Sequence, residues 1–382
     1  MIERVLRLAA GPAVVAAALV VGVGPAADKA PASEPQKKTK AVPAKPAPVL
    51  KPGEPAAHGL RETDLEALRT ILRKAVADKA VPGVALLLAH RGEVVFKEAF
   101  GDLKIDEPVK MASDTKPVAA TVVMTVVDQG KMRLNDPLTK FVPEFKGTKV
   151  EKATVRQLLS HSAGISDQFP GGWPRANTLA EFADAVAAQG SLQEPGKFRY
   201  SSVGIDLACR CAEKAAGRPF EELARERLWE PLGMRHTRFV GGGDAEAVPK
   251  EARDRGEGRY VSGGGGLSAT LDDMAAFYQM HLNGGRYGDK QVLSGKAVAE
   301  MHKRQSAAPR GMSYGLGFFL VGPRRDGVSR TFQHGGALGT FCWADGSRQL
   351  VGVFFSQAGL QKTAPVLGAV QKKVYELVPA GR

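Results

Sequence analysis

One stretch of the sequence, residues 111–130, constrains the fold more than any other. It reads MASDTKPVAATVVMTVVDQG, and its apolar side chains recur at helical spacing up to Gly130, where a helix C-cap is expected. If the helix begins near Ser113, Lys116 lies one turn further along on the same face. The pattern therefore predicts an apolar helix with a hydroxyl and an amine side by side at its positive end.

Such a pair is suited to nucleophilic catalysis. The hydroxyl of Ser113 needs a neighbouring base to take its proton, and Lys116 can be that base only when its amine is neutral. Burial and the positive end of a helix both lower the pKa of a lysine, and the first N–H groups of the helix are free to bind an oxyanion. This is the only S-x-x-K in the chain, although the pattern by itself also fits a serine N-cap with a solvated lysine.

Strand patterns stand towards both ends of the chain, with a mostly helical stretch between them. Residues 155–283 show helical periodicity with glycine-rich breaks, and one break, residues 262–266 (SGGGG), is expected to be a loop too flexible to pack. We therefore predict an α/β fold of the α+β type, an antiparallel sheet flanked by helices with an inserted, mainly helical domain. The predicted strands are residues 84–89, 93–100, 317–321, 330–333, 339–343 and 350–356.

The start of the chain is predicted to lie outside the folded domain. Residues 1–27 combine early arginines with an uncharged run, which indicates an export signal or, alternatively, an uncleaved membrane anchor. Residues 28–60, rich in proline, alanine and lysine, are expected to be a disordered linker. We expect an exported protein of the periplasm, cell envelope or medium. The folded domain is predicted as residues 61–382, divided into a sheet subdomain (about 61–110 and 305–382) and a helical subdomain (about 111–304).

Charge and cysteine content limit the partners. The net charge of +13 over 382 residues favours electrostatic contact with an anionic wall or membrane surface, and no nucleic-acid-binding module is found. The three cysteines form no disulfide framework. No H-E-x-x-H motif or clustered histidine and cysteine set is found, so we expect neither a metal nor another cofactor.

Several stretches, in this order, resemble the serine β-lactamase and penicillin-binding protein superfamily, in particular its class C-like branch of esterases, carboxypeptidases and β-lactamase-related hydrolases. They are the stretch around Ser113, VRQLLSHSAGI at 155–165, the stretch that starts RYSSVGIDLACRC at 199, GGGGLSATLDDMAAFYQMHLNGG, YGLGFF and FQHGGALGTFCWAD. The resemblance covers about residues 65–378 and implies a β-lactamase/transpeptidase-like fold.

The resemblance also implies roles for individual residues. The nucleophile of the family falls on Ser113, its lysine base on Lys116, and the tyrosine of its second motif, a proton relay, on Tyr200. The backbone N–H groups of Ser113 and Ala337 are implied to form the oxyanion hole. The residues implied to bind substrate or oxyanion are Ser202, His334, Gly335, Gly336 and Ala337.

The residues at three positions leave the type of reaction, or their own part in it, undecided. Ser202 stands where the second motif commonly ends in asparagine, and the loss of an amide donor puts efficient β-lactam turnover in doubt. His334 is expected either to bind a substrate carboxylate when protonated or to tune the lysine–tyrosine pair. His161, between two serines, is interpreted as part of a turn beneath the site rather than as a catalytic residue.

The expected function is that of an exported serine hydrolase that forms an acyl-enzyme on an amide or an ester. A β-lactamase, a D-alanyl-D-alanine carboxypeptidase or peptidase, and an esterase all remain open, with a small-molecule or peptidoglycan-like substrate. The alternative is a catalytically inactive binding protein of the cell envelope, which Ser202 favours and the Ser113, Lys116 and Tyr200 set opposes.

Overall fold

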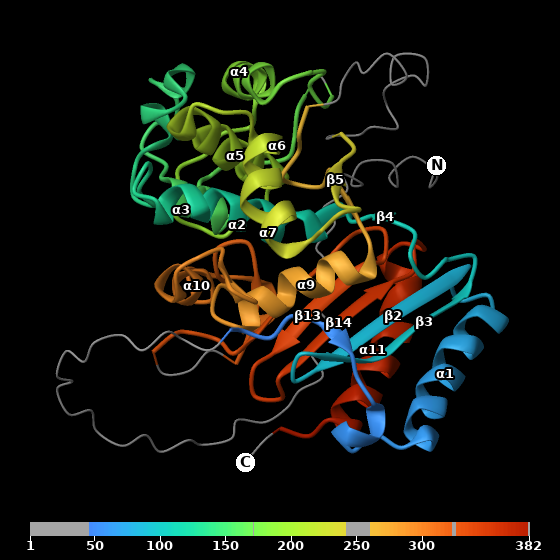
Figure 1. Ribbon diagram of the computed structural model, residues 1–382. Coiled ribbons are helices and arrows are strands. Elements are labelled where there is room, and N and C mark those ends of the chain that lie inside the picture. Colours follow the sequence, from blue (N-terminus) through green and yellow to red (C-terminus); the bar gives the residue numbers. More distant parts are fainter. Residues whose placement is uncertain (1–45, 171, 242–259, 323–325, 381–382) are drawn as a thin grey trace, which may run out of the picture.

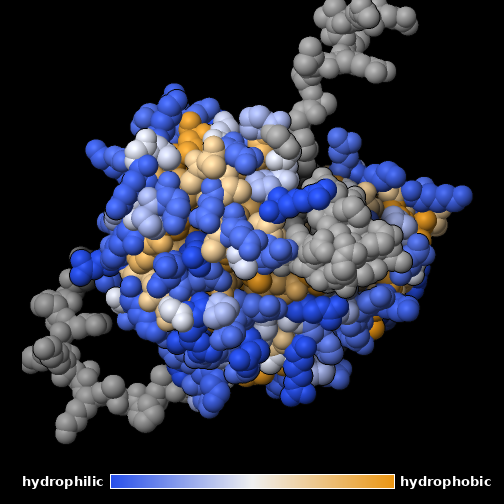
Figure 2. All heavy atoms as spheres, turned by 90° about the horizontal axis from the view of Figure 1, so that it is seen from above, coloured by the Kyte–Doolittle hydropathy of each residue, from blue (hydrophilic) through white to orange (hydrophobic). Residues whose placement is uncertain are grey.

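The computed structural model describes residues 46–170, 172–241, 260–322 and 326–380 (Figure 1). The export segment expected at 1–27 and the first part of the expected linker lie outside these ranges. Within them, no helix is both long and apolar enough to cross a lipid bilayer. On the face seen from above the helical region, hydrophilic residues predominate and apolar ones are interspersed (Figure 2). Only Val49 and Leu338 are exposed large apolar side chains among the described residues.

A nine-stranded sheet forms the base of the molecule, with the order β1-β3-β2-β14-β13-β12-β11-β10-β9. Its neighbouring strands pair antiparallel, except that β1 runs parallel to β3. The antiparallel sheet predicted from strands at both ends of the chain is thus present. The strands are β1 (Lys51–Pro52), β2 (Gly83–His90), β3 (Glu93–Gly101), β9 (Ser306–Ala307), β10 (Ser313–Tyr314), β11 (Phe319–Val321), β12 (Thr331–Gly335), β13 (Phe341–Asp345) and β14 (Leu350–Phe355).

Helices cover both faces of the sheet, which explains why the central strands β2, β13 and β14 are buried along their whole length. Helices α1 (Glu62–Ala77) and α11 (Leu360–Leu377) pack on one face and α9 (Leu271–Leu282) on the other (Figure 1). Successive side chains of a strand point to opposite faces. Leu86 and Leu88 of β2 accordingly join the core beneath α1 and α11, whereas Leu87 joins the core shared with the helical region.

The helical region lies on the far side of α9 from the sheet (Figure 1). Its central helix is α2 (Thr115–Asp128), in which every residue up to Val126 is buried and which packs against α5 (Ser202–Ala216). The end of α2 is as predicted, since Gly130 follows it with a φ of +73°. The remaining helices of this region are α3 (Val155–Leu159), α4 (Leu179–Gln189), α6 (Phe220–Ala224), α7 (Glu230–Leu232) and α10 (Gly295–Met301).

Short strands complete the fold. A three-stranded sheet, β4 (Val109–Lys110), β6 (Leu267–Ala269) and β5 (Arg238–Phe239), lies beside the start of α2, and a hairpin consists of β7 (Arg286–Tyr287) and β8 (Lys290–Gln291). The three-stranded sheet matters for the site because the carbonyl oxygen of Leu267 accepts a hydrogen bond of 2.8 Å from the N–H of Met111, two residues before Ser113.

Two boundaries differ from the sequence prediction. Residues 46–60, expected to be disordered linker, include β1 and a 3-10 turn, Pro55–His58, so the described fold begins well before residue 61. Strand β1 is ordered because it hydrogen-bonds along the edge of β3. Helix α9 was assigned to the helical subdomain but packs on β2, β13 and β14. Periodicity alone shows that a helix has an apolar face, not which layer that face meets.

We predict that Gly352→Ala destabilises the protein by about 1–3 kcal/mol, because the side chain has no room. Gly352 on β14 pairs with Trp343 on β13, and a Cβ there would lie 2.1 Å from an indole carbon of Trp343. Urea unfolding followed by fluorescence measures the change. The control is Gly295→Ala in the first turn of α10, where the nearest atom to a new Cβ is 3.8 Å away and little change is expected. Equal stability of the two variants would contradict the steric argument.

Candidate active site

The fold places Lys116 in the first turn of α2 with its amine fully buried. Its Nζ lies 3.0 Å from Ser113 Oγ, 3.1 Å from Ser202 Oγ and 2.7 Å from the carbonyl oxygen of Gly264. Ser113 itself stands in a 3-10 turn, Ala112–Asp114, that leads into the helix. The predicted hydroxyl–amine pair is therefore in direct contact, and two further oxygens complete the surroundings of the amine.

The turn that presents Ser113 is strained. Ala112 has a φ of +47°, a left-handed conformation that costs a residue with a Cβ about 1–2 kcal/mol. Thr115 stabilises this turn, since its hydroxyl donates to the carbonyl of Ala112 at 2.6 Å and accepts the N–H of Leu267 at 3.1 Å. The local strain is thus compensated by bonds between the turn, the helix and β6.

Burial lowers the pKa of Lys116 to about 8, and the negative charges of Asp167 and Asp206 oppose that shift. The oxygens that contact the amine belong to hydroxyls and a carbonyl, not to a carboxylate. A neutral amine at this position can accept the proton of the Ser113 hydroxyl. The electrostatics therefore suit Lys116 to the role of general base near neutral pH.

Tyr200 lies immediately before α5, with Lys116 Nζ 4.7 Å from the centre of its ring. Burial raises the pKa of the phenol, so Tyr200 remains protonated and cannot act as a phenolate base. Its hydroxyl forms no hydrogen bond of acceptable geometry with the described residues, although the Ser113 hydroxyl is close enough to oppose the rise in pKa. A neutral phenol here is placed to give a proton rather than to take one first.

The glycine-rich loop at residues 262–266 is a rigid part of the site, and the expectation of a loop too flexible to pack is wrong. A Cβ on Gly263 would lie 2.4 Å from Cys209 Sγ, and one on Gly264 would lie 2.7 Å from the Cβ of Ser202. The glycines let the loop lie directly against α5, which brings the carbonyl of Gly264 to the lysine amine. Sequence reasoning missed this because a glycine can stand at a position either for its conformational freedom or for its lack of a side chain, and the sequence does not show which of the two applies.

Asp206 on α5 holds this loop, and it was also missed. Its buried carboxylate accepts hydrogen bonds from the Gly264 N–H at 2.8 Å, the Tyr260 hydroxyl at 2.9 Å and the Ser262 hydroxyl at 3.1 Å. Burial raises its pKa to about 7, against the lowering effect of these donors. A charged residue within the apolar pattern of α5 was the available sequence signal, because a buried carboxylate needs partners.

A second missed carboxylate, Asp167, anchors the start of α5. It accepts hydrogen bonds from the N–H of Ser202 at 2.8 Å, the N–H of Val203 at 3.0 Å and the hydroxyl of Ser201 at 2.8 Å. A carboxylate at a helix N-terminus satisfies free N–H groups and interacts favourably with the helix dipole. Asp167 thereby fixes the position of Ser202, which contacts Lys116. Nothing in the sequence near Asp167 connects it with a helix 35 residues away.

Residues 334–337 run along the opposite wall, from the end of β12 into a turn. A Cβ on Gly336 would lie 2.2 Å from the carbonyl oxygen of Met111, so only glycine lets this strand end reach the turn that carries Ser113. The hydroxyl of Thr340 donates to the same carbonyl at 2.9 Å. Within the described residues, neither the N–H of Ser113 nor that of Ala337 has a hydrogen-bond partner. Both remain available for an oxyanion, in agreement with the predicted pair.

His334 is a neutral, fully buried residue of this wall. Burial, together with the charge of Lys116, lowers its pKa to about 3. Its Nε2 lies 3.3 Å from the Tyr314 hydroxyl, and its Nδ1 lies 2.9 Å from the N and 3.0 Å from the O of Gly335. Because burial disfavours the charged imidazole and both nitrogens have partners within the protein, this geometry does not favour the expectation that His334 binds a substrate carboxylate as a cation. Coupling to Lys116, the other expectation, fits the geometry.

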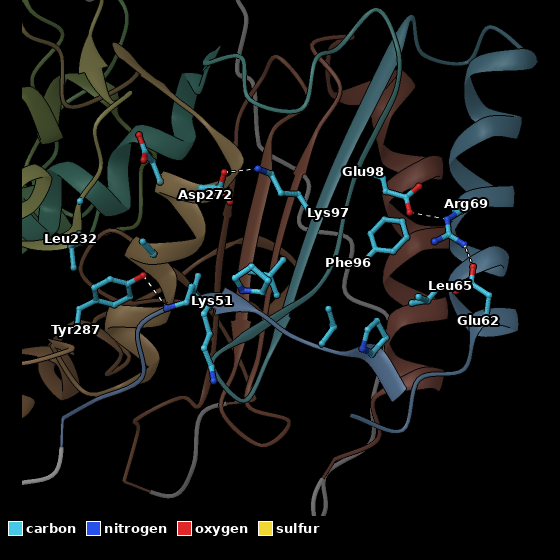
Figure 3. A pocket seen from close by; sticks show the side chains of 18 residues that line it. Lys51, Glu62, Leu65, Arg69, Phe96, Lys97, Glu98, Leu232, Asp272 and Tyr287 are labelled. Carbon is cyan, nitrogen blue, oxygen red and sulfur yellow. Dashed lines mark hydrogen bonds and ion pairs between the residues drawn. The ribbon is translucent and has the colours of Figure 1, made fainter. Parts of the chain in front are cut away.

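A cavity of about 720 Å³ lies away from these residues, along β1 and β3 between α1 and α9 (Figure 3). Its charged side chains pair with one another across the groove: Arg69 Nε is 2.7 Å from Glu98, and Lys97 Nζ is 2.6 Å from Asp272. Most of its charged side chains are therefore neutralised by a neighbour, and none of the residues around Ser113 and Lys116 lines this cavity. Among the described residues, no group of three histidine, cysteine or acidic side chains is arranged to hold a metal ion.

Comparisons with known proteins agree with this geometry. A family profile described as Beta-lactamase matches residues 68–372. D-alanyl-D-alanine-carboxypeptidase/endopeptidase AmpH of Escherichia coli (strain K12) is 25% identical over 297 residues, 68% of this chain and 75% of AmpH. Esterase EstB of Burkholderia gladioli is 23% identical over 347 residues, 75% of this chain and 87% of EstB. A solved beta-lactamase-type structure from Bacteroides dorei DSM 17855 superposes with a TM-score of 0.71 at 27% identity, over 82% of this chain and 98% of that one.

We predict that the acylation rate rises with pH through about 8 and then reaches a plateau. The reason is that the neutral amine of Lys116, whose pKa is about 8, is the base. Stopped-flow measurement of the first turnover of a nitrophenyl ester between pH 6 and 10 gives the profile. The variant Lys116→Met should lose the rise together with most of the rate. A flat profile for the wild-type protein would exclude lysine as the titrating base.

We predict that Asp206→Asn moves this rise to lower pH. The Asp206 carboxylate raises the pKa of Lys116, so its removal lowers that pKa and makes the neutral amine available sooner. The amide oxygen of asparagine can still accept the Gly264 N–H, so the plateau should stay within about tenfold. The control is Asp184→Asn, a loss of the same charge on the exposed side of α4, which should leave the profile in place. A shift to higher pH in Asp206→Asn would contradict the argument.

Proposed function

This chain belongs to the beta-lactamase family of serine hydrolases, and from that premise we propose that it is an esterase that works through an acyl-enzyme on Ser113. Its substrates carry no free carboxylate at the recognition position of the site. The contact between Ser113 and Lys116, together with a lysine pKa near 8, opposes the alternative of an inactive binding protein.

In the proposed reaction, the neutral amine of Lys116 takes the proton of Ser113 as its hydroxyl oxygen attacks the ester carbonyl. The N–H groups of Ser113 and Ala337 bind the oxyanion of the tetrahedral intermediate. The carbon–oxygen bond to the leaving group then breaks, and the Tyr200 phenol gives the alkoxide a proton and regains one from the Lys116 ammonium. Water releases the acyl group by the same steps in reverse order, which restores Ser113.

The observation that carries the proposal is the full burial of His334 and the bonding of both its ring nitrogens within the protein. Many members of the family carry Lys-Thr-Gly or, as here, His-x-Gly at this position, and a carboxypeptidase must bind the terminal carboxylate of its substrate. Here the corresponding side chain is buried, uncharged and bonded within the protein. A substrate carboxylate would lose its hydration and gain no cation in exchange, which is unfavourable by several kcal/mol. An uncharged ester avoids that penalty.

Ser202 supports the same choice. An asparagine at this position would offer an amide donor to the carbonyl of a peptide or penicillin side chain. The Ser202 hydroxyl is shorter and already accepts a hydrogen bond from Lys116 at 3.1 Å. Substrates whose binding depends on a side-chain amide are therefore less favoured than simple esters. Among the relatives, EstB bears the name of an esterase and AmpH that of a carboxypeptidase/endopeptidase, so both activities occur at this level of similarity.

We also propose that the enzyme acts outside the cytoplasm. The support is the basic start and uncharged run of residues 1–27 followed by a proline-, alanine- and lysine-rich segment. A basic protein exported in this way would meet anionic wall polymers or lipid headgroups, which would concentrate it near esters of the envelope.

The proposal predicts a preference for uncharged substrates that a matched pair measures directly. The pair is an acyl-peptide ending in a free carboxylate and the same compound with that carboxylate converted to a carboxamide, which removes the charge without adding a second ester. We expect kcat/KM to be at least about tenfold higher for cleavage of the uncharged compound and for simple nitrophenyl esters. Intact-mass spectrometry after a fluorophosphonate should show one adduct, which Ser113→Ala abolishes.

The variant Ser202→Asn is the specificity control, since it should raise activity on the acyl-peptide relative to the nitrophenyl ester. Faster cleavage of the compound with the free carboxylate would exclude the esterase proposal and favour a carboxypeptidase. A fluorophosphonate adduct that persists in Ser113→Ala would instead exclude Ser113 as the nucleophile.

A further inference from the structure

His161 is bonded to the chain on both sides of Tyr200. Its carbonyl oxygen accepts the N–H of Arg199 at 2.6 Å, and its ring Nδ1 accepts the N–H of Ser201 at 3.2 Å. The two residues that flank the phenol are thus held by one residue from a turn 40 positions earlier in the chain. Bonds at both neighbours restrict the backbone of the residue between them.

The ring of His161 also contacts the phenol itself. Its centre lies 4.4 Å from that of Tyr200 and 4.6 Å from that of Tyr314. The hydroxyl of Tyr314 is 3.3 Å from Nε2 of His334, on the wall that leads to the oxyanion position. A continuous series of tilted ring contacts therefore joins Tyr200 to the sheet, with the imidazole of His161 in the middle.

These contacts matter because the polar end of Tyr200 is held weakly, since the Ser113 hydroxyl is close to it but outside good hydrogen-bond geometry. Its hydroxyl lacks a hydrogen bond of good geometry within the described part of the chain, so backbone bonds and ring contacts determine where the phenol points. Proton transfer requires the donor within hydrogen-bond distance of the acceptor, and a displacement of about 1 Å can cost about a hundredfold in rate. A residue that orients this ring therefore affects the reaction.

The backbone of His161 is unfavourable for a residue that serves only as a turn. Its φ of +58° lies in the left-handed region, where glycine or asparagine would be the easier choice. Histidine is retained there with its side chain buried and packed on Tyr200. Burial, aided by the charge of the Lys116 ammonium, lowers the pKa of the imidazole, so it stays neutral and its Nδ1 stays available as an acceptor.

From this geometry we infer that His161 is the positioning residue of Tyr200, which holds the phenol where it can protonate the leaving group. The inference deepens the proposed function and rests on it, since Tyr200 is the general acid of the proposed reaction. His161 contacts neither Ser113 nor the substrate in this scheme and acts only through the phenol. The turn that the sequence predicts beneath the site therefore serves to orient Tyr200.

The test compares two substrates that differ in their leaving group. A nitrophenolate leaves without help, whereas an alkoxide needs a proton from the general acid. We expect His161→Gly to lower kcat/KM for an alkyl ester by about a hundredfold and that for the nitrophenyl ester of the same acid by less than about fivefold. The ratio of the two rates does not depend on how much of the variant is folded. A ratio equal to that of the wild type would overturn the inference.

Two further variants test separately the hydrogen-bond acceptor of His161 and the contacts of its ring. His161→Asn keeps an oxygen near the position of Nδ1 and tolerates the left-handed backbone, whereas His161→Phe keeps the ring contacts without the acceptor. Each should restore part of the alkyl-ester rate lost in His161→Gly. If neither restores any of it, the positioning role is wrong.

Tyr200→Phe distinguishes failure of this inference from failure of the proposed reaction. That variant should show the same selective loss on the alkyl ester, and adding His161→Gly to it should cause little further loss, because both changes remove one function. Additive losses would overturn the positioning role while leaving the reaction intact. If Tyr200→Phe shows no selective loss, Tyr200 is not the general acid and the inference falls with it, whereas fluorophosphonate labelling of Ser113 still reports the nucleophile.

Discussion

The buried amine of Lys116 is the interaction on which the rest of the site depends. A lysine charge deprived of water is costly, and this site offers it only hydroxyl and carbonyl oxygens. A carboxylate in direct contact would stabilise the ammonium and remove the base. The sequence of α2 delivers the amine to this place, because the helix is apolar on every side and so lies at the centre of the helical region.

Two carboxylates, those of Asp167 and Asp206, position the residues that contact the amine of Lys116. Asp206 orients the loop that presents the Gly264 carbonyl, and Asp167 orients the start of α5 that presents Ser202. Each makes its bonds to N–H and O–H groups rather than to the amine, so it fixes geometry and only moderately opposes the lowered pKa of Lys116. This arrangement gives the lysine rigid acceptors without a fixed opposite charge, which is what a base working near neutral pH requires.

The limits of sequence reasoning differ from one residue to another. The contact of Ser113 with Lys116 was predictable because three residues along a helix start are always neighbours. The strands β2, β3 and β14 were predictable for the same kind of reason, since their apolar runs are local. The loop at 262–266 was misjudged because its rigidity comes from Cys209 and Ser202 on another element. Two roles stayed open for His334 because the charge of a histidine depends on its burial, which the sequence does not contain.

By itself, the sequence determined the main strands and helices, the contact between Ser113 and Lys116, and, through its resemblance, the beta-lactamase family to which the chain belongs. The tertiary structure alone decided which oxygens surround the amine, which carboxylates hold them, that the imidazole at 334 is neutral, and that His161 packs on Tyr200. The physical reason is how far apart along the chain the interacting residues lie. Helix and strand periodicity is local, whereas solvation and long-range contacts exist only once distant segments have packed together.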